Sequence, residues 1–182
     1  EMQRSLVGSE MCIRDSHISI YRIKYIFKVI TIHKRSDIMI EQDTVTLLRE
    51  CDAGIKMGVY SIEEVLGDVN NGNFKQMLEK AKSDHQQLQD EIQILLDKYH
   101  DDGKDPNPMA KGMSWFKTNI KISADSSDNT IADLITDGCN MGVKTLHKYL
   151  NKYKAADEKS KDIAKKLINI EEELIVDMRS YL

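Results

Sequence analysis

The chain has 182 residues, of which 41% are hydrophobic and 31% are charged, with only 2 Pro, 9 Gly and 3 Cys and a formal net charge of −4. This composition excludes a disordered chain and a disulfide-stapled small protein, and no run of about 18 apolar residues predicts a membrane span. Scarce proline with abundant Lys, Glu, Leu, Ile and Asp predicts an all-α fold.

The first 38 residues read as a non-native leader. Residues 5–16 (SLVGSEMCIRDS) resemble an in-frame translation of a transposon-end adapter used in sequencing libraries. Residues 17–38 have the Ile, Tyr, Lys and Phe bias of translated AT-rich non-coding DNA, and lysines interrupt any signal-peptide core. We therefore expect residues 1–38 to be disordered or unpacked, and a domain of residues 39–182 to start at Met39.

The domain expected after this leader is more acidic than the whole chain. Residues 39–182 carry 19 Lys and Arg against 26 Asp and Glu, which gives a net charge of −7. Binding to a phosphate backbone needs clustered positive charge, so we expect no nucleic acid partner. Only Cys51 and Cys139 remain, both among helical apolar positions. Two such thiols favour reduced cysteines and a cytoplasmic protein over a disulfide framework.

Apolar positions spaced three and four residues apart predict two helices in the first half. The first stripe runs from Val45 to Val69, interrupted by Asp52. A turn at Asn70–Asn73 follows it, with Asn73 as the expected N-cap of the next helix. The second stripe consists of Phe74, Leu78, Ala81, His85, Leu88, Ile92, Leu95 and Tyr99.

Both prolines lie in residues 101–108, which separate this half from the next. Pro108 suits the first turn of a short amphipathic helix that carries Met109, Met113, Phe116 and Ile120.

The second half again predicts two helices. The third stripe runs from Ile131 to Tyr153. The fourth helix is expected to be capped near Asp157, with apolar positions at Ile163, Leu167, Ile170, Leu174, Met178 and Tyr181.

An internal repeat relates the two halves. Residues 54–59 (GIKMGV) match residues 138–143 (GCNMGV) at an offset of 84, and the second and fourth helices align at an offset of 82. The pattern predicts a duplicated αα-hairpin. Residues 101–127 are long enough to travel the length of a bundle, so this crossover predicts ferritin-like connectivity.

Four glycines of the repeat, Gly54, Gly58, Gly138 and Gly142, lie four residues apart within helices. Glycine inside a helix costs roughly 0.5–1 kcal/mol relative to alanine, so it needs a structural reason. The favoured interpretation is a close crossing of the first and third helices. The alternative is space for a ligand or for a bulky facing side chain.

His85 is the inward polar residue of the second helix. Counting back from the turn places it near Met57 and Gly58 of the first helix. The favoured interpretation is a core histidine that is bonded to a carbonyl or water and fitted against a glycine gap. The alternative is a ligand-binding histidine.

Acidic residues near the apolar stripes have ordinary structural interpretations. We expect Asp52 to form an ion pair with His147 or Lys165 that sets helix register. We expect Glu171–Glu173 to form a solvated face with Lys165 and Lys166.

A ferritin-type di-metal site requires inward Glu residues and a Glu-x-x-His motif on each of two helices. Lys82 lies three residues before His85, and the fourth helix has no histidine, so oxidative di-iron chemistry is not expected. No catalytic residues and no cofactor are predicted. The remaining weak candidates for a degenerate metal or small-ligand site are His85, Asp52, Glu63, Glu79 and Asp177.

Two segments carry a family resemblance: residues 108–115 (PMAKGMSW) and residues 132–142 (ADLITDGCNMG). Residues 39–182 resemble a ferritin-like four-helix-bundle family of bacterial (Firmicutes) proteins known only as a domain of unknown function. The resemblance implies the bundle and brings neither an activity nor a ligand set.

Two functional hypotheses follow from these patterns. The first is a non-enzymatic bundle that acts through protein association, as a homodimer or with a protein partner, because the ligand set is missing and Trp115 and Phe116 lie in the crossover. The alternative is a degenerate ferritin-like binder of a metal or small ligand. Neither hypothesis involves a membrane or a nucleic acid.

Overall fold

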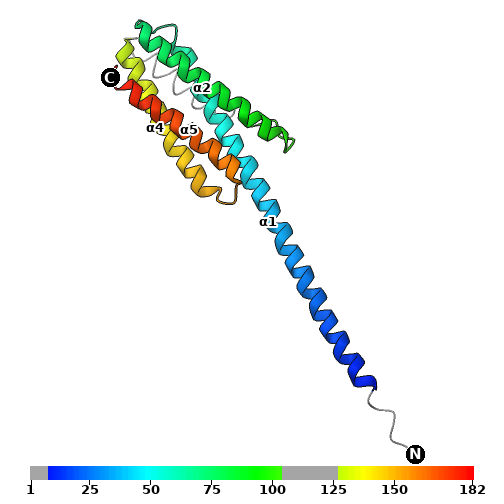
Figure 1. The fold of residues 1–182 in the computed structure, drawn as a ribbon. Helices are drawn as coiled ribbons and strands as arrows, with labels where there is room; N and C mark the ends of the chain where they lie inside the picture. The colour runs from blue at the N-terminus through cyan, green and yellow to red at the C-terminus, as the bar shows by residue number, and fades with distance from the viewer. Residues whose placement is uncertain (1–7, 104–126) are drawn as a thin grey trace, which may run out of the picture. The chain divides into compact units, whose positions relative to one another are not determined.

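The computed structural model describes the backbone of residues 8–103 and 127–182. It describes the side chains of residues 37–103 and 127–182 and those of Lys28, Ile30, Thr31 and Lys34. Within them all regular structure is helical: α1 (Gly8–Val65), α2 (Gly72–Asp97), α4 (Asp128–Lys152) and α5 (Glu158–Met178) (Figure 1). The predicted all-α fold is confirmed. The short helix expected after Pro108 lies outside the described residues.

The chain divides into two units, residues 1–40 and residues 41–182. In the first unit the backbone from Gly8 onward is helical, and the side chains of Ile30 and Ile38 are exposed. The non-native origin of residues 1–38 stays a prediction. The second unit contains both apolar core clusters.

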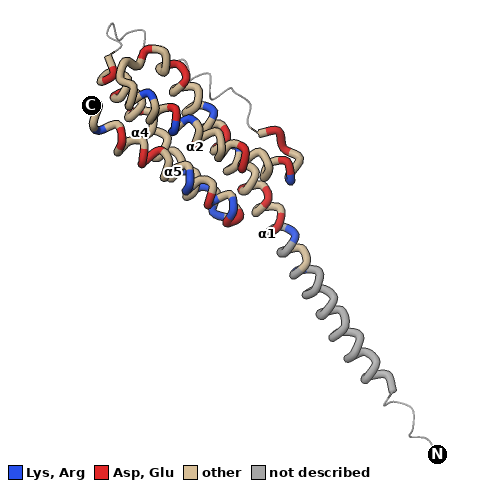
Figure 2. Tube along the Cα trace, turned by 45° about the horizontal axis from the view of Figure 1, so that its top comes forward, with Lys and Arg blue, Asp and Glu red and all other residues tan. Residues whose placement is uncertain are grey.

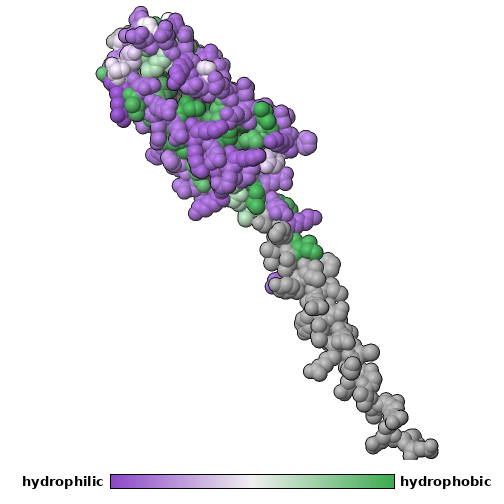
Figure 3. Space-filling view, in the orientation of Figure 1, coloured by the Kyte–Doolittle hydropathy of each residue, from purple (hydrophilic) through white to green (hydrophobic). Residues whose placement is uncertain are grey.

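In the second unit, residues 41–65 of α1 and the helices α2, α4 and α5 form a four-helix bundle (Figure 1). Acidic and basic residues are distributed along all four helices, and the visible face of the bundle is largely hydrophilic (Figures 2 and 3). This distribution is typical of amphipathic helices that bury one face. No helix in the described ranges is long and apolar enough to cross a membrane.

The helix starts follow ordinary capping chemistry, with one correction. The Asn71 side chain, not that of Asn73, caps α2, because it accepts hydrogen bonds from the backbone N–H groups of Asn73 and Phe74. Asn71 has extended backbone angles, which aim its side chain at these first-turn donors. The predicted cap of α5 is confirmed, since Asp157 accepts a hydrogen bond from the N–H group of Ser160 at 2.7 Å.

Side chains of one helix pair also bind the turn of the other pair. The carboxylate of Asp128, in the first turn of α4, accepts hydrogen bonds from the N–H groups of Asn70 and Asn71 in the α1–α2 turn. In return, the carboxylate of Asp43 in α1 accepts a hydrogen bond from the N–H group of Ala155 in the α4–α5 turn. The two helical hairpins are therefore joined by reciprocal bonds.

The apolar core consists of two clusters. One is built around Leu48, Ile55, Leu96 and Leu167 and the other around Ile62, Phe74, Ile135 and Met178. Most positions predicted to face inward are buried, but a few at the edges of the apolar stripes are only half-buried. Leu96 is fully buried, whereas Leu95 is only half-buried.

The predicted partners of Asp52 are wrong. Asp52 is buried, and its Oδ2 lies 2.6 Å from Nζ of Lys56, one turn later on the same helix. Lys165 instead pairs with Asp162, and His147 is exposed. Two residues at i and i+4 on one helix are always close enough to pair, whereas a partner on another helix depends on the crossing geometry.

Candidate functional site

A cavity of about 210 Å³, partly open to solvent, lies among the four helices of the bundle. All four described helices contribute to its walls, which consist mainly of small and apolar side chains. It is lined by Glu50, Ala53, Gly54, Met57, Gly58, Ser61, Ile62, His85, Leu134, Ile135, Gly138, Cys139, Met141, Gly142, Thr145, Leu146, Tyr149, Leu167, Glu171 and Leu174.

The four repeat glycines line this cavity, and no atom that an added Cβ would meet belongs to the facing glycine-bearing helix. Their interpretation as a close helix crossing stays a prediction. A Cβ atom added at Gly138 would meet no atom within 4 Å, and one added at Gly54 would meet only Leu167 of α5, at 3.7 Å. The nearest atoms to a Cβ at Gly58 belong to His85, and those nearest to a Cβ at Gly142 belong to Glu171. The missing side chains therefore leave space between α1 and α4, as the alternative interpretation proposed.

His85 occupies one wall of the cavity and is 1% exposed. Its Nδ1 lies 2.7 Å from the carbonyl oxygen of Ala81, and its Nε2 lies 3.4 Å from Oε1 of Glu171. A Cβ atom at Gly58 would approach the imidazole ring to 3.1 Å. The predicted histidine, bonded to a carbonyl and fitted against a glycine gap, is confirmed in these contacts.

Glu171 is the site residue that sequence reasoning missed. It was expected on a solvated face, yet it is 7% exposed and lies beside His85, while Glu172 and Glu173 are exposed. Glu171 follows Leu167 by four residues and precedes Leu174 by three, so helical spacing places it on the buried stripe. That spacing was the available signal, and the neighbouring charges obscured it.

The contacts of His85 determine where its protons lie. A carbonyl oxygen can only accept, so Nδ1 carries a hydrogen and donates it to Ala81. Nε2 faces Oε1 of Glu171, so a proton on Nε2 is placed to be donated to that oxygen. Burial lowers the pKa of His85, but the hydrogen bond and the charge of Glu171, together with the Ala81 carbonyl, raise this pKa above its ordinary value overall. The pair therefore favours an imidazolium beside a carboxylate.

The other polar groups around the cavity add no cation. Burial, followed by the charge of Glu171, raises the pKa of the Cys139 thiol well above its ordinary value, so this thiol stays protonated. At the wall formed by Glu50 and Tyr149, burial and a hydrogen bond to Glu50 raise the pKa of Tyr149 to about 12. No Lys or Arg is among the described residues that line the cavity.

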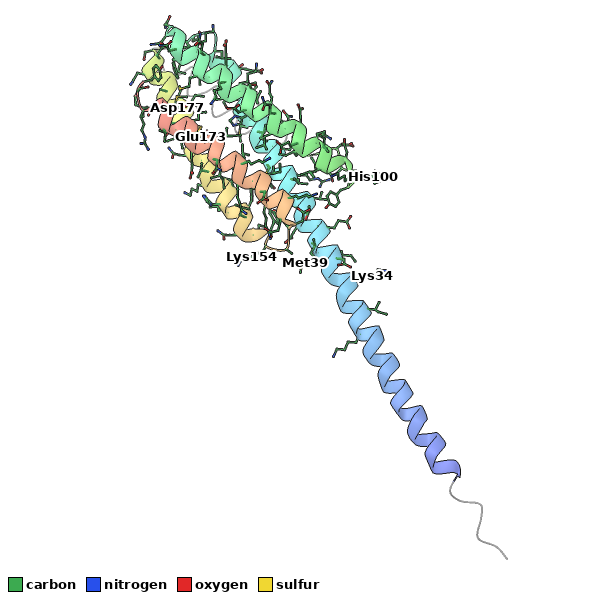
Figure 4. The ribbon with its side chains drawn as sticks, viewed as in Figure 1. Lys34, Met39, His100, Lys154, Glu173 and Asp177 are labelled. Carbon is green, nitrogen blue, oxygen red and sulfur yellow. The ribbon has the colours of Figure 1, made fainter. Side chains whose placement is uncertain are left out.

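The other weak candidates do not join this site. Glu63 pairs with Lys82 at 2.7 Å, Asp52 pairs with Lys56, and Glu79 is exposed. Asp177 is exposed on α5, where Figure 4 labels it together with Glu173. No group of three or more His, Cys, Asp or Glu that could hold a metal ion occurs among the described residues.

Substitutions at two of the glycines should have different effects on stability. Gly138→Ala should raise the free energy of unfolding by about 0.5–1 kcal/mol, because alanine favours the helix and its methyl group enters open space. Gly58→Ala should give no gain or a loss, because its methyl group meets the His85 ring. Urea denaturation of both variants checks this. Equal stabilisation by the two substitutions would show that the imidazole moves away at no cost.

Comparisons of the chain with protein-family models, with curated proteins and with solved structures found no match.

Proposed function

We propose that the bundle binds a small, mainly apolar molecule in the cavity between α1 and α4. The observation that carries the proposal is the cavity itself: about 210 Å³ of space next to four helical glycines and a buried His85–Glu171 pair. The walls of this cavity are mainly apolar, so an apolar ligand that displaces water from it removes apolar surface from solvent, which favours binding.

The volume limits the size of the ligand. An engineered apolar cavity of roughly 150 Å³ holds one benzene molecule. A space of about 210 Å³ therefore fits a substituted ring or a short branched chain. The two polar groups of the His85–Glu171 pair would orient such a ligand, as a few polar groups do in ligand sites that are otherwise apolar.

The fold proposal remains the ferritin-like bundle with a duplicated hairpin, as the resemblance implies. The reciprocal turn bonds support the duplication. The N–H group of Asn71 binds Asp128, and the N–H group of Ala155 binds Asp43, and the two N–H groups are 84 residues apart, which is the offset of the glycine repeat. The crossover between the halves lies outside the described residues.

Of the two ligand classes in the binder hypothesis, a metal or a small molecule, the geometry favours a small molecule. His85 and Glu171 bind each other, and the described carboxylates proposed as further metal ligands lie elsewhere. Protein association, with a second copy or another protein, stays a prediction, and Trp115 and Phe116 lie outside the described residues. The cytoplasm stays the predicted compartment of this chain, in which Cys51 and Cys139 are free.

The proposal is tested by titrating the full chain with benzyl alcohol and with toluene while observing ¹³C-labelled methionine methyl groups. Met57 and Met141 line the cavity, whereas Met178 is buried in the core and does not line it. We expect saturable shifts at Met57 and Met141, a small effect at Met178, and loss of the response in Gly138→Leu, which fills the space. Gly67→Leu is the matched control, because Gly67 also has no neighbour within 4 Å but is exposed. Absence of a saturable shift at both cavity methionines, with both probes, would contradict the proposal.

A further inference from the structure

We infer that the ligand of this cavity is a small organic cation, a primary amine on an apolar body, whose ammonium group binds Glu171 in exchange for a proton of His85. This inference rests on the proposed function and specifies its ligand class.

The charges of the cavity wall favour a cation over an anion. Two carboxylates, those of Glu50 and Glu171, belong to the wall, and the sole group there that can become positive, among the described lining residues, is His85. An anionic ligand would face these carboxylates with no Lys or Arg to balance it. A cationic ligand would meet a buried carboxylate whose surroundings strengthen electrostatic attraction.

The position of the Glu171 carboxylate suits an incoming ammonium group. Its Oε1 lies 3.9 Å from the site of a Cβ atom at Gly58 and 3.4 Å from that at Gly142. Since both of these positions lack a side chain, the carboxylate is adjacent to the cavity space. A primary ammonium group has three donors, so it can bond to Glu171 and still reach a second acceptor.

The apolar lining fits the rest of such an amine. Met57 and Met141 come from α1 and α4, and the ring of Tyr149 belongs to the wall that Glu50 also forms. Thioether sulfur atoms adapt to ligands of irregular shape and contact aromatic rings favourably. The face of a tyrosine ring attracts cations.

Binding of the ammonium group exchanges one cation for another. In the proposed exchange, a protonated His85 balances the Glu171 carboxylate before the amine binds, across the 3.4 Å contact between Nε2 and Oε1. When the ammonium group takes that place, His85 releases the proton of Nε2 to solvent and keeps the Nδ1 hydrogen on Ala81. The neutral Nε2 is then an acceptor for the second N–H of the ammonium group. The protein therefore binds one amine cation and releases one proton. No bond to carbon is made or broken.

The other ionisable groups near His85 do not replace it in this exchange. Asp84 of α2 and Glu50 of α1 are carboxylates and favour a positive charge on either partner. Cys139 of α4 stays protonated because burial raises the pKa of its thiol. The released proton is therefore assigned to His85.

The test measures binding of three matched probes to the full chain by calorimetry: 2-phenylethylamine, 2-phenylethanol and phenylacetate. We expect the amine to bind about tenfold or more tightly than the alcohol, and phenylacetate to bind most weakly. Amine affinity should rise as the pH increases toward the raised pKa of His85, because His85 then gives up its proton more easily. Titrations in two buffers of different ionisation enthalpy should report release of up to about one proton per amine.

Variants locate the effect. Glu171→Gln should weaken amine binding about tenfold and leave binding of the alcohol nearly unchanged, whereas Glu173→Gln, an exposed change on the same helix, should alter neither. If Glu171→Gln does not fold, the number of protons that the unmodified chain releases per bound amine tests the inference instead. Equal binding of amine and alcohol, or no proton release, would overturn the amine inference and leave the proposed cavity function standing. Failure of all three probes to shift Met57 and Met141 would overturn both.

Discussion

Replacing His85 with Leu is expected to lower the free energy of unfolding by about 3 kcal/mol at about pH 7. The substitution leaves the Glu171 carboxylate in an apolar wall where no described Lys or Arg can compensate it. Glu171→Leu should cost less, because the remaining imidazole can lose its charge and keep its hydrogen bond to Ala81. The double variant should also be more stable than His85→Leu, since it buries no unpaired charge. Chemical denaturation of the three variants measures this order.

The pH dependence of stability provides an independent check on this pair. In the folded chain the pKa of His85 is raised, so its contribution to stability is complete below the unfolded-state pKa and is lost as pH rises through the folded-state pKa. The original chain should therefore lose stability on the alkaline side of this window, while Glu171→Leu should lose less. The deficit of His85→Leu relative to the original chain should therefore shrink on that alkaline side, because the variant has no histidine contribution to lose. A deficit that stays constant with pH would indicate lost packing rather than a stranded charge.

The largest loss of stability, about 3–5 kcal/mol, is expected for Phe74→Ala. Phe74 is fully buried at the first turn of α2, and its ring stacks on that of Tyr181 with the centroids 4.4 Å apart. Removing the ring opens a cavity in the cluster that also contains Leu78 and Met178. It also removes an aromatic contact that holds the C-terminal residues against α2.

The matched control for Phe74→Ala is Ile94→Ala on the same helix. Ile94 is 61% exposed, so its loss should change stability by less than about 0.5 kcal/mol. Guanidinium denaturation of both variants, followed by circular dichroism, compares them. A loss below about 1 kcal/mol for Phe74→Ala would show that Tyr181 and its neighbours collapse into the space, contrary to a rigidly packed cluster.

Much of the fold follows from local patterns that the sequence displays directly. The three- and four-residue spacing of apolar side chains predicts α2, α4 and α5 within a few residues of their ends, because burial of one face dominates helix placement. Asp157 was identified as a cap for the same local reason, since capping acts over three residues. The sequence does not distinguish Asn71 from Asn73 as the cap, because two asparagines in one turn offer the same chemistry. The backbone angles select Asn71.

Long-range pairings were predicted less well. Counting residues from a turn correctly placed His85 opposite Gly58, since a short turn fixes the register of two neighbouring helices. The same counting failed for Asp52, because partners across the bundle depend on crossing angles that no turn fixes. The sequence pattern wrongly predicts that Glu171 is exposed. A glutamate on the buried stripe is tolerated when a partner such as His85 faces it. His85 lies 86 residues earlier in the chain, so local spacing does not reveal this partner.

The sequence by itself determined that this chain is helical, where three of its helices lie, that His85 points inward and that four helical glycines need a structural reason. These properties depend on side chains within one or two turns of each other, so the spacing of residue types is sufficient to reveal them. The tertiary structure decided that the glycines surround a cavity and that Glu171 is the partner of His85. Both depend on how far apart the helices pack, and that distance is set by side chains from all four helices together.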